Sequence, residues 1–180
     1  MLRRTSTEQD RHACTENGKP VSAVVPCTDH NRCTGASGED AGRTDKPVIA
    51  ERAMYWGEGT PLGEACHDSV GTPAAHSTFF LPDGETQNGY ETWTLVQNPN
   101  PGEIEVLVSY LTPDGNGDIQ FTDTLPPNSR KSYSMADRLG AGKASAVVKC
   151  VTAGKKIIVE RSMYWSNMGA GTCTIGGFSD

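Results

Sequence analysis

The chain contains the stretch Pro47-Val48-Ile49-Ala50-Glu51-Arg52-Ala53-Met54-Tyr55-Trp56 and a later copy of it, Lys156-Ile157-Ile158-Val159-Glu160-Arg161-Ser162-Met163-Tyr164-Trp165. The two glutamates of these copies, Glu51 and Glu160, lie 109 residues apart. Each copy is followed by a Gly-rich loop and a short closing segment, Ser69-Val70-Gly71 in the first and Thr174-Ile175-Gly176 in the second. A period near 110 residues matches a β-sandwich module and is too long for one turn of a solenoid.

The repeat divides the chain into three parts. Residues 75–180 form a complete unit that ends in its own copy of the repeated strand, and residues 48–74 are the last strand and exit loop of a preceding unit. Residues 1–47 show almost no hydrophobic periodicity, and we expect them to be an irregular or disordered remnant. The chain therefore reads as a fragment of a longer tandem array.

Turn signals divide the complete unit into about seven short strands. The segment from Glu103 to Leu111 alternates polar and apolar residues, as a half-buried antiparallel strand requires. This pattern predicts an all-β fold, an immunoglobulin-like antiparallel β-sandwich. The core is expected to include Phe80, Trp93, Leu95, Val106, Val108, Tyr110, Phe121, Val148 and Ile158.

Composition narrows the choice of partners. The 180 residues carry a net charge of -6, and residues 1–47 contain seven Lys/Arg and seven Asp/Glu, which leaves nine and fifteen for the rest. The folded part is acidic, so nucleic acid is not an expected partner. No apolar run reaches the ~20 residues of a membrane helix, and no signal peptide is seen at the start. The six cysteines leave a disulfide open, without indicating its partners.

Four motifs taken together resemble a known repeat: ETWTLVQNPNP at 91–101, VLVSYLTPDG at 106–115, LPPNSRKS at 125–132 and VERSMYW at 159–165. The set is similar to an Ig-like domain of unknown function that occurs in tandem in surface proteins of actinobacteria and related bacteria. Related arrays often close with a His-Asp segment, which His67-Asp68-Ser69 matches, whereas Thr172-Cys173-Thr174 departs from it. The resemblance implies an extracellular, wall-associated module and supplies no catalytic or binding residue.

Four residues are candidates for a ligand platform: Trp93, Arg161, Tyr164 and Trp165. Neighbours in a strand point to opposite faces, so Arg161 and Trp165 should share one face while Glu160 and Tyr164 share the other. An exposed arginine with aromatic rings suits a sugar or a peptide. The alternative is structural, because aromatic residues of small sandwiches usually pack in the core and a buried arginine needs a partner.

Two segments contain the residue types of a metal site. Asp114, Asn116 and Asp118 place oxygen side chains at alternate positions, as calcium loops do, but Ile119 and Leu125 stand where such a loop has its glycine and its bidentate glutamate. A hairpin turn explains the same residues. His12, Cys14 and the segment 27–33, with its two cysteines and His30, have zinc-ligand types without a standard spacing. We expect no cofactor.

Catalysis is not expected either. Cys66-His67-Asp68-Ser69 contains the residue types of a nucleophile triad, but such triads are built from separated segments. Nucleophile elbows, phosphate loops and dinucleotide fingerprints are absent from the sequence. The sequence therefore predicts a non-catalytic repeat module of a surface protein that acts as a spacer or an adhesive domain. Its expected partners are neighbouring repeats, cell-wall polysaccharide or another surface protein. The alternative is a carbohydrate-binding accessory module of a larger secreted enzyme.

Overall fold

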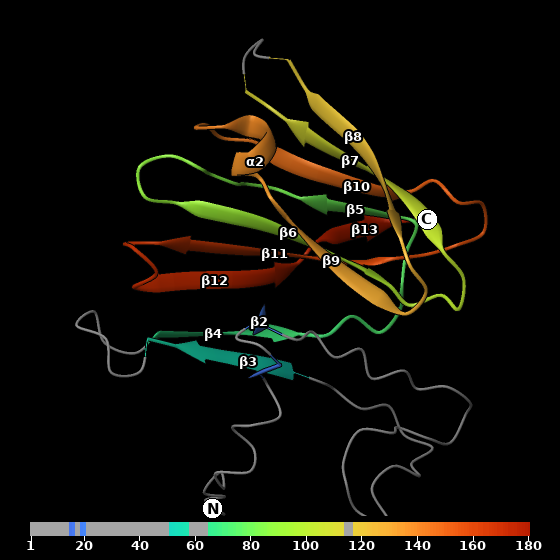
Figure 1. The fold of residues 1–180 in the computed structure, drawn as a ribbon, viewed down its shortest axis with the longest axis horizontal. Helices are drawn as coiled ribbons and strands as arrows, with labels where there is room; N and C mark the ends of the chain where they lie inside the picture. The colour runs from blue at the N-terminus through green and yellow to red at the C-terminus, as the bar shows by residue number, and fades with distance from the viewer. Residues whose placement is uncertain (1–14, 17–18, 21–50, 58–64, 114–116) are drawn as a thin grey trace, which may run out of the picture. The chain divides into compact units, whose positions relative to one another are not determined.

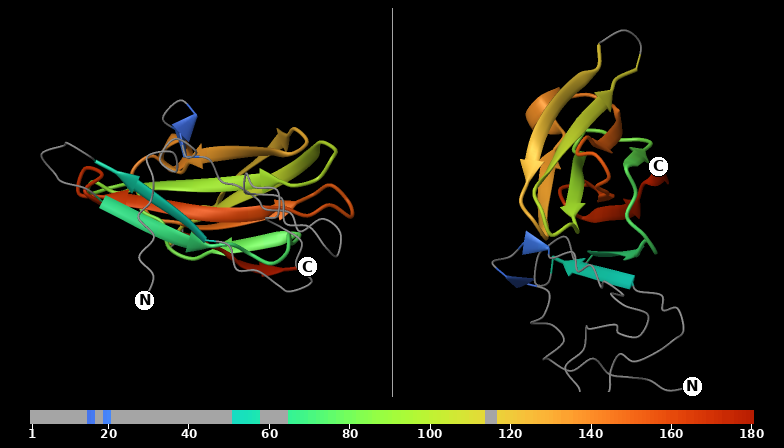
Figure 2. Two further views of the ribbon diagram at one scale, coloured as in Figure 1. Left: turned by 90° about the horizontal axis from the view of Figure 1, so that it is seen from below. Right: turned by 90° about the vertical axis from the view of Figure 1, so that its right-hand side faces the viewer.

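The computed structural model of the chain describes residues 15–16, 19–20, 51–57, 65–113 and 117–180. These residues form antiparallel strands and one short helix, α2 (Ala136–Leu139). Two sheets pack face to face as a sandwich (Figure 1, Figure 2). The predicted fold class, an all-β immunoglobulin-like antiparallel sandwich, is confirmed. The described part of the chain contains no helix long and apolar enough to cross a membrane.

The first sheet has five strands in the order β13 (Gly177–Ser179), β5 (Thr78–Leu81), β10 (Ser145–Cys150), β7 (Ile104–Leu111) and β8 (Ile119–Leu125). Each neighbouring pair is antiparallel. The predicted hairpin after Leu111 joins β7 to β8, and its Gly117 has φ 78, which a residue without a Cβ adopts readily. The predicted single helical turn after β9 is α2.

The second sheet has four strands in the order β12 (Ala170–Ile175), β11 (Ile158–Trp165), β6 (Glu91–Asn98) and β9 (Ser129–Ser134). The sandwich therefore has nine strands where about seven were predicted. The two additional strands, β12 and β13, are short, and each contains a glycine, a residue that is depleted in strands. In constant-type immunoglobulin domains the first two strands pair with each other. Here β5 pairs with β10 and β13, whereas β6 pairs with β9 and β11.

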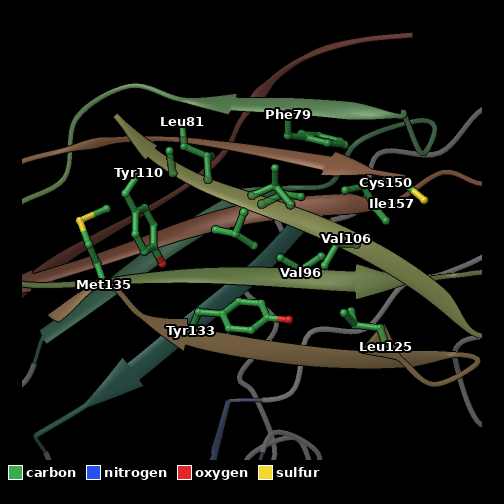
Figure 3. Packing of buried hydrophobic residues seen from close by; sticks show 14 of the residues in the cluster. Phe79, Leu81, Val96, Val106, Tyr110, Leu125, Tyr133, Met135, Cys150 and Ile157 are labelled. Carbon is green, nitrogen blue, oxygen red and sulfur yellow. The ribbon is translucent and has the colours of Figure 1, made fainter. Parts of the chain in front are cut away.

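The core lies between the two sheets, and Figure 3 shows part of its packing. Burying each Val, Leu, Ile or Phe side chain contributes roughly 1.5–3 kcal/mol, so this cluster is the main source of stability. Its members are Phe79, Leu81, Val96, Ile104, Val106, Val108, Tyr110, Leu125, Tyr133, Met135, Ala144, Ala146, Val148, Cys150, Ile157 and Val159.

Four of the predicted core residues are confirmed in this cluster: Val106, Val108, Tyr110 and Val148. The prediction for Phe80 and Ile158 was wrong by one residue, because the neighbours Phe79 and Ile157 take the inward positions. Phe80 is 44% exposed. Phe79-Phe80 and Ile157-Ile158 are each two apolar residues in succession, so alternation alone could not show which of the two points into the core.

Of the remaining three predicted core residues, Leu95 is buried as predicted, whereas Phe121 and Trp93 are half-buried. Phe121 is half-buried and packs against the edge of the cluster. Leu95 and Trp93 both lie on the outer face of β6, because successive residues of a strand point to opposite faces and the neighbouring Val96 points into the core. The aromatic and aliphatic residues of β6 thus serve both faces of the second sheet.

A further pair of strands, β3 (Glu51–Trp56) and β4 (Ala65–Val70), forms a two-stranded sheet that we call the N-terminal hairpin. It belongs to the same compact unit, 49–180, as the sandwich. Its pairing repeats that of β11 with β12 at every position: Arg52 faces Ser69 as Arg161 faces Thr174, and Trp56 faces Ala65 as Trp165 faces Ala170. The internal repeat of the sequence is therefore a repeat of one hairpin with one register.

Two very short strands precede this unit. β1 (Thr15–Glu16) and β2 (Lys19–Pro20) pair with each other in antiparallel fashion. The rest of the predicted remnant 1–47 lies outside the described residues.

Candidate functional site

The N-terminal hairpin packs against the side of β11 and β12 that faces away from the core, which we call the acceptor face. The acceptor face carries Glu160, Ser162, Tyr164, Gly171 and Cys173. Strand alternation gives the hairpin two sides. The side chains turned toward the acceptor face are Arg52, Met54, Trp56, His67 and Ser69, and those turned away are Glu51, Ala53, Tyr55, Cys66, Asp68 and Val70. Figure 1 and Figure 2 show β4 alongside β12.

A charged contact lies at one end of this interface. Arg52 Nη2 is 3.5 Å from Glu160 Oε2, and Ser69 Oγ donates a hydrogen bond to Glu160 Oε1 at 3.3 Å. The two ionic side chains are only 19% and 13% exposed. A carboxylate buried to this degree is costly unless it is paired. The hairpin therefore supplies two partners of Glu160, Arg52 and Ser69.

A second guanidinium, that of Arg130 on β9, belongs to the same charged group. Burial lowers the pKa of Arg130, the positive charge of Arg52 lowers it further, and the negative charge of Glu160 raises it. Arg52 Nη2 also donates to Cys173 Sγ at 3.2 Å, and burial raises the pKa of that thiol. The thiol is thus protonated at neutral pH and acts as a weak acceptor in a packed interface.

An aromatic contact lies at the other end of the interface. The ring of Trp56 meets Tyr164 edge to face with centroids 5.4 Å apart, and the ring of His67 lies 5.2 Å from Trp56. His67 Nε2 is 3.4 Å from Tyr164 Oη. Gly171 makes room for this arrangement, since a Cβ there would come within 2.7 Å of Tyr164 Cδ1 and 3.1 Å of Trp56 Cη2. Tyr164 is paired with Gly171 across the two strands, and its ring covers the backbone that a residue without a side chain leaves exposed.

The turn between β11 and β12 contributes a backbone acceptor. Ser166, Asn167 and Met168 have φ values of 55, 54 and 65, three successive non-glycine residues in the left-handed region. Each such residue costs on the order of 1 kcal/mol and persists only where the surroundings hold it. The carbonyl of Met168 accepts a hydrogen bond from Trp56 Nε1. The strained turn thus holds an oxygen where the indole of the hairpin can reach it.

His67 is a titratable group buried in the interface, at 8% exposed. Burial lowers the pKa of its imidazole and the charge of Arg52 lowers it further, against the opposing effects of Glu160 and Asp68. Burial raises the pKa of the facing Tyr164 hydroxyl. At neutral pH, therefore, an uncharged imidazole meets an uncharged phenol.

Acidification is expected to loosen the N-terminal hairpin. The docked hairpin holds His67 with a pKa below 6.5, whereas undocking returns it toward that ordinary value, so the undocked state takes up the proton first. This contribution to docking is complete above pH ~7 and is lost as the pH falls through 6.5 to the lowered pKa. Amide hydrogen exchange of β3 and β4 at pH 7.5 and 5.5, corrected for the intrinsic exchange rate, measures the effect.

The control for this prediction is His67→Asn, which keeps a polar side chain and removes the titration. Its hairpin should show the same protection at both pH values. Wild-type protection that stays constant or rises at pH 5.5 would contradict the role assigned to His67.

The structure does not bring the four predicted platform residues to one surface. Tyr164 is 8% exposed beneath the hairpin, and Trp93 lies across from Ser162 on the same outer face, half-buried. Arg161 and Trp165 point to the opposite side of β11, as the alternation predicted. Arg161 Nη1 donates to the carbonyls of Pro82 and Asp83, and the ring of Trp165 stacks on Tyr90 with centroids 5.8 Å apart.

The predicted metal and catalytic candidates are placed as follows. Asp114 and Asn116 lie outside the described residues, as do His12, Cys14 and the segment 27–33, whereas Asp118 is exposed at the start of β8. No group of three or more metal-ligating side chains occurs among the residues that the structure describes. Cys66, Cys150 and Cys173 are free thiols. Cys66 is exposed while His67 is buried on the other side of β4, so the two side chains point apart.

His76 lies in a separate polar group at the C-terminal end. Its ring stacks on Phe178 with centroids 3.8 Å apart, and its Nδ1 is 3.3 Å from Asp180 Oδ2. The same carboxylate forms an ion pair with Lys156 Nζ at 2.8 Å and accepts a hydrogen bond from the backbone amide of Ser77 at 3.0 Å. Together these contacts lower the pKa of Asp180 to about 2. They fasten the short strand β13 to its neighbour β5.

The residues that form the interface were mostly missed by sequence reasoning. Arg52, Glu160 and Gly171 were not identified as members of one contact, although the repeat and strand alternation predict which of them share a side. What the sequence did not indicate is that one copy of the repeated hairpin lies on the other. Gly171 appeared as one glycine among 20.

Comparisons with known proteins give one distant structural similarity and no family. No family model matches it, and no curated protein matches it. A solved structure of a Thermotoga maritima protein, designated 1070, is similar with a TM-score of 0.49 and 16% identity, covering 58% of this chain and 96% of that one. A match at this level identifies neither a family nor a function.

Proposed function

We propose that this protein is a non-catalytic repeat module of a tandem surface array, a spacer and interaction domain that works outside the cell. In this proposal the N-terminal hairpin, which is a copy of β11 and β12, packs on the acceptor face of the complete unit that follows it. The supporting observation is that the N-terminal hairpin, which repeats β11 and β12 in sequence and register, covers the outer side of those same strands. The resemblance to tandem surface repeats agrees with this assignment.

A docked hairpin is suited to a spacer because it stiffens the junction between units. In a tandem array each unit contacts only its neighbours, so the rigidity of the whole depends on the interface between successive units. Here that interface combines an ion pair, Arg52 with Glu160, and an aromatic contact, Trp56 with Tyr164, at its two ends. Two contacts set apart along the strands fix the angle of the hairpin as well as its position.

The chemistry of the interface supports a packing role over a catalytic one. Nucleophilic sulfur needs a lowered pKa, whereas burial raises the pKa of both Cys173 and Cys150. The imidazole of His67 contacts a phenol, and its neighbour in sequence, Cys66, faces the other way. Nor do the observations favour carbohydrate binding, because the docked hairpin covers Tyr164 and the other platform candidates lie apart.

Replacing Trp56 is expected to release the N-terminal hairpin. Trp56→Ala removes the edge-to-face contact with Tyr164 and the hydrogen bond to the Met168 carbonyl, which together should weaken docking by about 2 kcal/mol. Such a loss is a ~30-fold fall in hydrogen-exchange protection of the β4 amides. The protection of β6 and β11 in the sandwich should remain within a factor of ~3 of the wild type.

Tyr55→Ala is the matched control, because Tyr55 is the preceding residue on the same strand and is 76% exposed on the other side. Its hairpin should keep the wild-type protection. If Trp56→Ala and Tyr55→Ala behave alike, the hairpin does not dock through the acceptor face and the proposed function fails.

A further inference from the structure

Among the described residues, no strand pairing joins the N-terminal hairpin to the sandwich. β3 and β4 form a sheet of their own, and within the described residues no backbone hydrogen bond joins them to β11 or β12. Side chains make the contacts across the interface described above, such as Arg52 with Glu160 and Trp56 with Met168. Undocking therefore breaks no strand ladder, and it leaves both the sandwich and its nine-stranded arrangement intact.

The hairpin is also tied to the sandwich by a short connection without regular structure. Residues 71–75 run from the end of β4 to His76, which forms an isolated bridge with Ile157. An isolated two-stranded hairpin is marginally stable in water, so the hairpin needs a face to pack on. Every copy of this chain offers the same face, and exchange of an identical element between copies is a low-cost route to assembly.

We propose that the acceptor face is a binding site for the N-terminal hairpin of a second copy of this chain. This inference rests on the proposed function, since it uses the same face, and it adds the partner. In trans the second hairpin makes the contacts that the chain's own hairpin makes in cis, with its Arg52 on Glu160 and its Trp56 on Tyr164. When two chains exchange hairpins reciprocally, both acceptor faces are filled and the pair closes.

The strength of the contact in trans follows from its strength in cis. A short tether holds the hairpin at an effective concentration on the order of 1 mM. We take docking in cis to be favoured ~30-fold, the factor expected to be lost in Trp56→Ala. Dividing the effective concentration by this factor gives the untethered contact a dissociation constant on the order of 30 µM. Exchange is thus minor in dilute solution and substantial where many copies crowd together, as on a surface.

Two full-length variants test the proposal by complementation. Gly171→Val blocks the acceptor face, because a side chain there would clash with Tyr164 and Trp56, and leaves the hairpin intact. Trp56→Ala disables the hairpin and leaves the acceptor face vacant. Mixed at about 300 µM each, most chains should form heterodimers in analytical ultracentrifugation, while each variant alone stays monomeric. A chain carrying both substitutions should bind neither single variant.

The outcomes separate this proposal from the proposed function. A mixture that stays monomeric, although hydrogen exchange shows the hairpin undocked in both variants, overturns binding in trans and leaves docking in cis standing. Hairpins that remain protected in the single variants overturn the proposed function itself. Dimers that form in either variant alone also overturn the proposal, because they would use another surface.

Discussion

Phe79→Ala is expected to lower the free energy of unfolding by about 3–5 kcal/mol. Phe79 is 0% exposed at the centre of β5, where it packs in the core and contacts the rings of His76 and Phe178 at centroid distances of 6.0 and 5.9 Å. Alanine leaves a cavity that the two closely packed sheets cannot fill. The loss is a large part of the 5–15 kcal/mol that stabilises a typical domain, and the melting temperature should fall by roughly 10–20 °C.

Phe80→Ala is the matched control in denaturant unfolding, because the same ring is removed one residue later. Phe80 points outward and is 44% exposed, so its loss should cost about 1 kcal/mol or less. Equal losses in the two variants, or a greater loss for Phe80, would mean that β5 presents its other face to the core and that the strand phase described above is wrong.

Gly171→Val is expected to undock the N-terminal hairpin while the sandwich stays folded. A Cβ at this position would lie 2.7 Å from Tyr164 Cδ1, so the tyrosine ring must swing away and Trp56 loses the surface that it packs against. Hydrogen-exchange protection of β3 and β4 should fall ~30-fold, to that of a free hairpin. Valine is itself better suited to a strand than glycine, so β12 should not be weakened by its backbone preference.

The comparison variant is Gly177→Val in β13, where an added Cβ would meet nothing nearer than 3.9 Å. It should leave the protection of the hairpin unchanged. A Gly171→Val chain whose melting transition of the sandwich falls as far as that of Phe79→Ala would contradict this account, since the hairpin then could not be lost separately.

The fold class could be predicted because it depends on local patterns. Turn residues such as Pro82-Asp83-Gly84, and the alternation through Val106, Val108 and Tyr110, are visible within a few residues of sequence. The phase of β5 could not be predicted, because Phe79 and Phe80 are both apolar and only their neighbours in space decide between them. β12 and β13 were missed because these short strands contain too few large apolar residues to show an alternating pattern.

The candidate site was less predictable, because it depends on contacts between segments about a hundred residues apart. Alternation correctly separated Arg161 from Glu160, but it did not reveal that Glu160 would meet Arg52 from the other copy of the repeat. Aromatic content suggested a ligand platform, whereas Tyr164 is covered by protein. The identity of a covering element is a property of the whole chain, which no short motif carries.

The two copies of the hairpin differ at one position that limits how far such packing can extend. Gly171 stands opposite Tyr164, whereas its counterpart opposite Tyr55 is Cys66, and Tyr55 is correspondingly 76% exposed. A side chain at Cys66 occupies the space that an incoming tryptophan would need, so the outer side of the hairpin cannot take a second hairpin in the same way. Head-to-tail contacts of one kind otherwise grow without limit into filaments. In the assembly proposed above, this cysteine in place of a glycine would therefore limit the number of copies that can join.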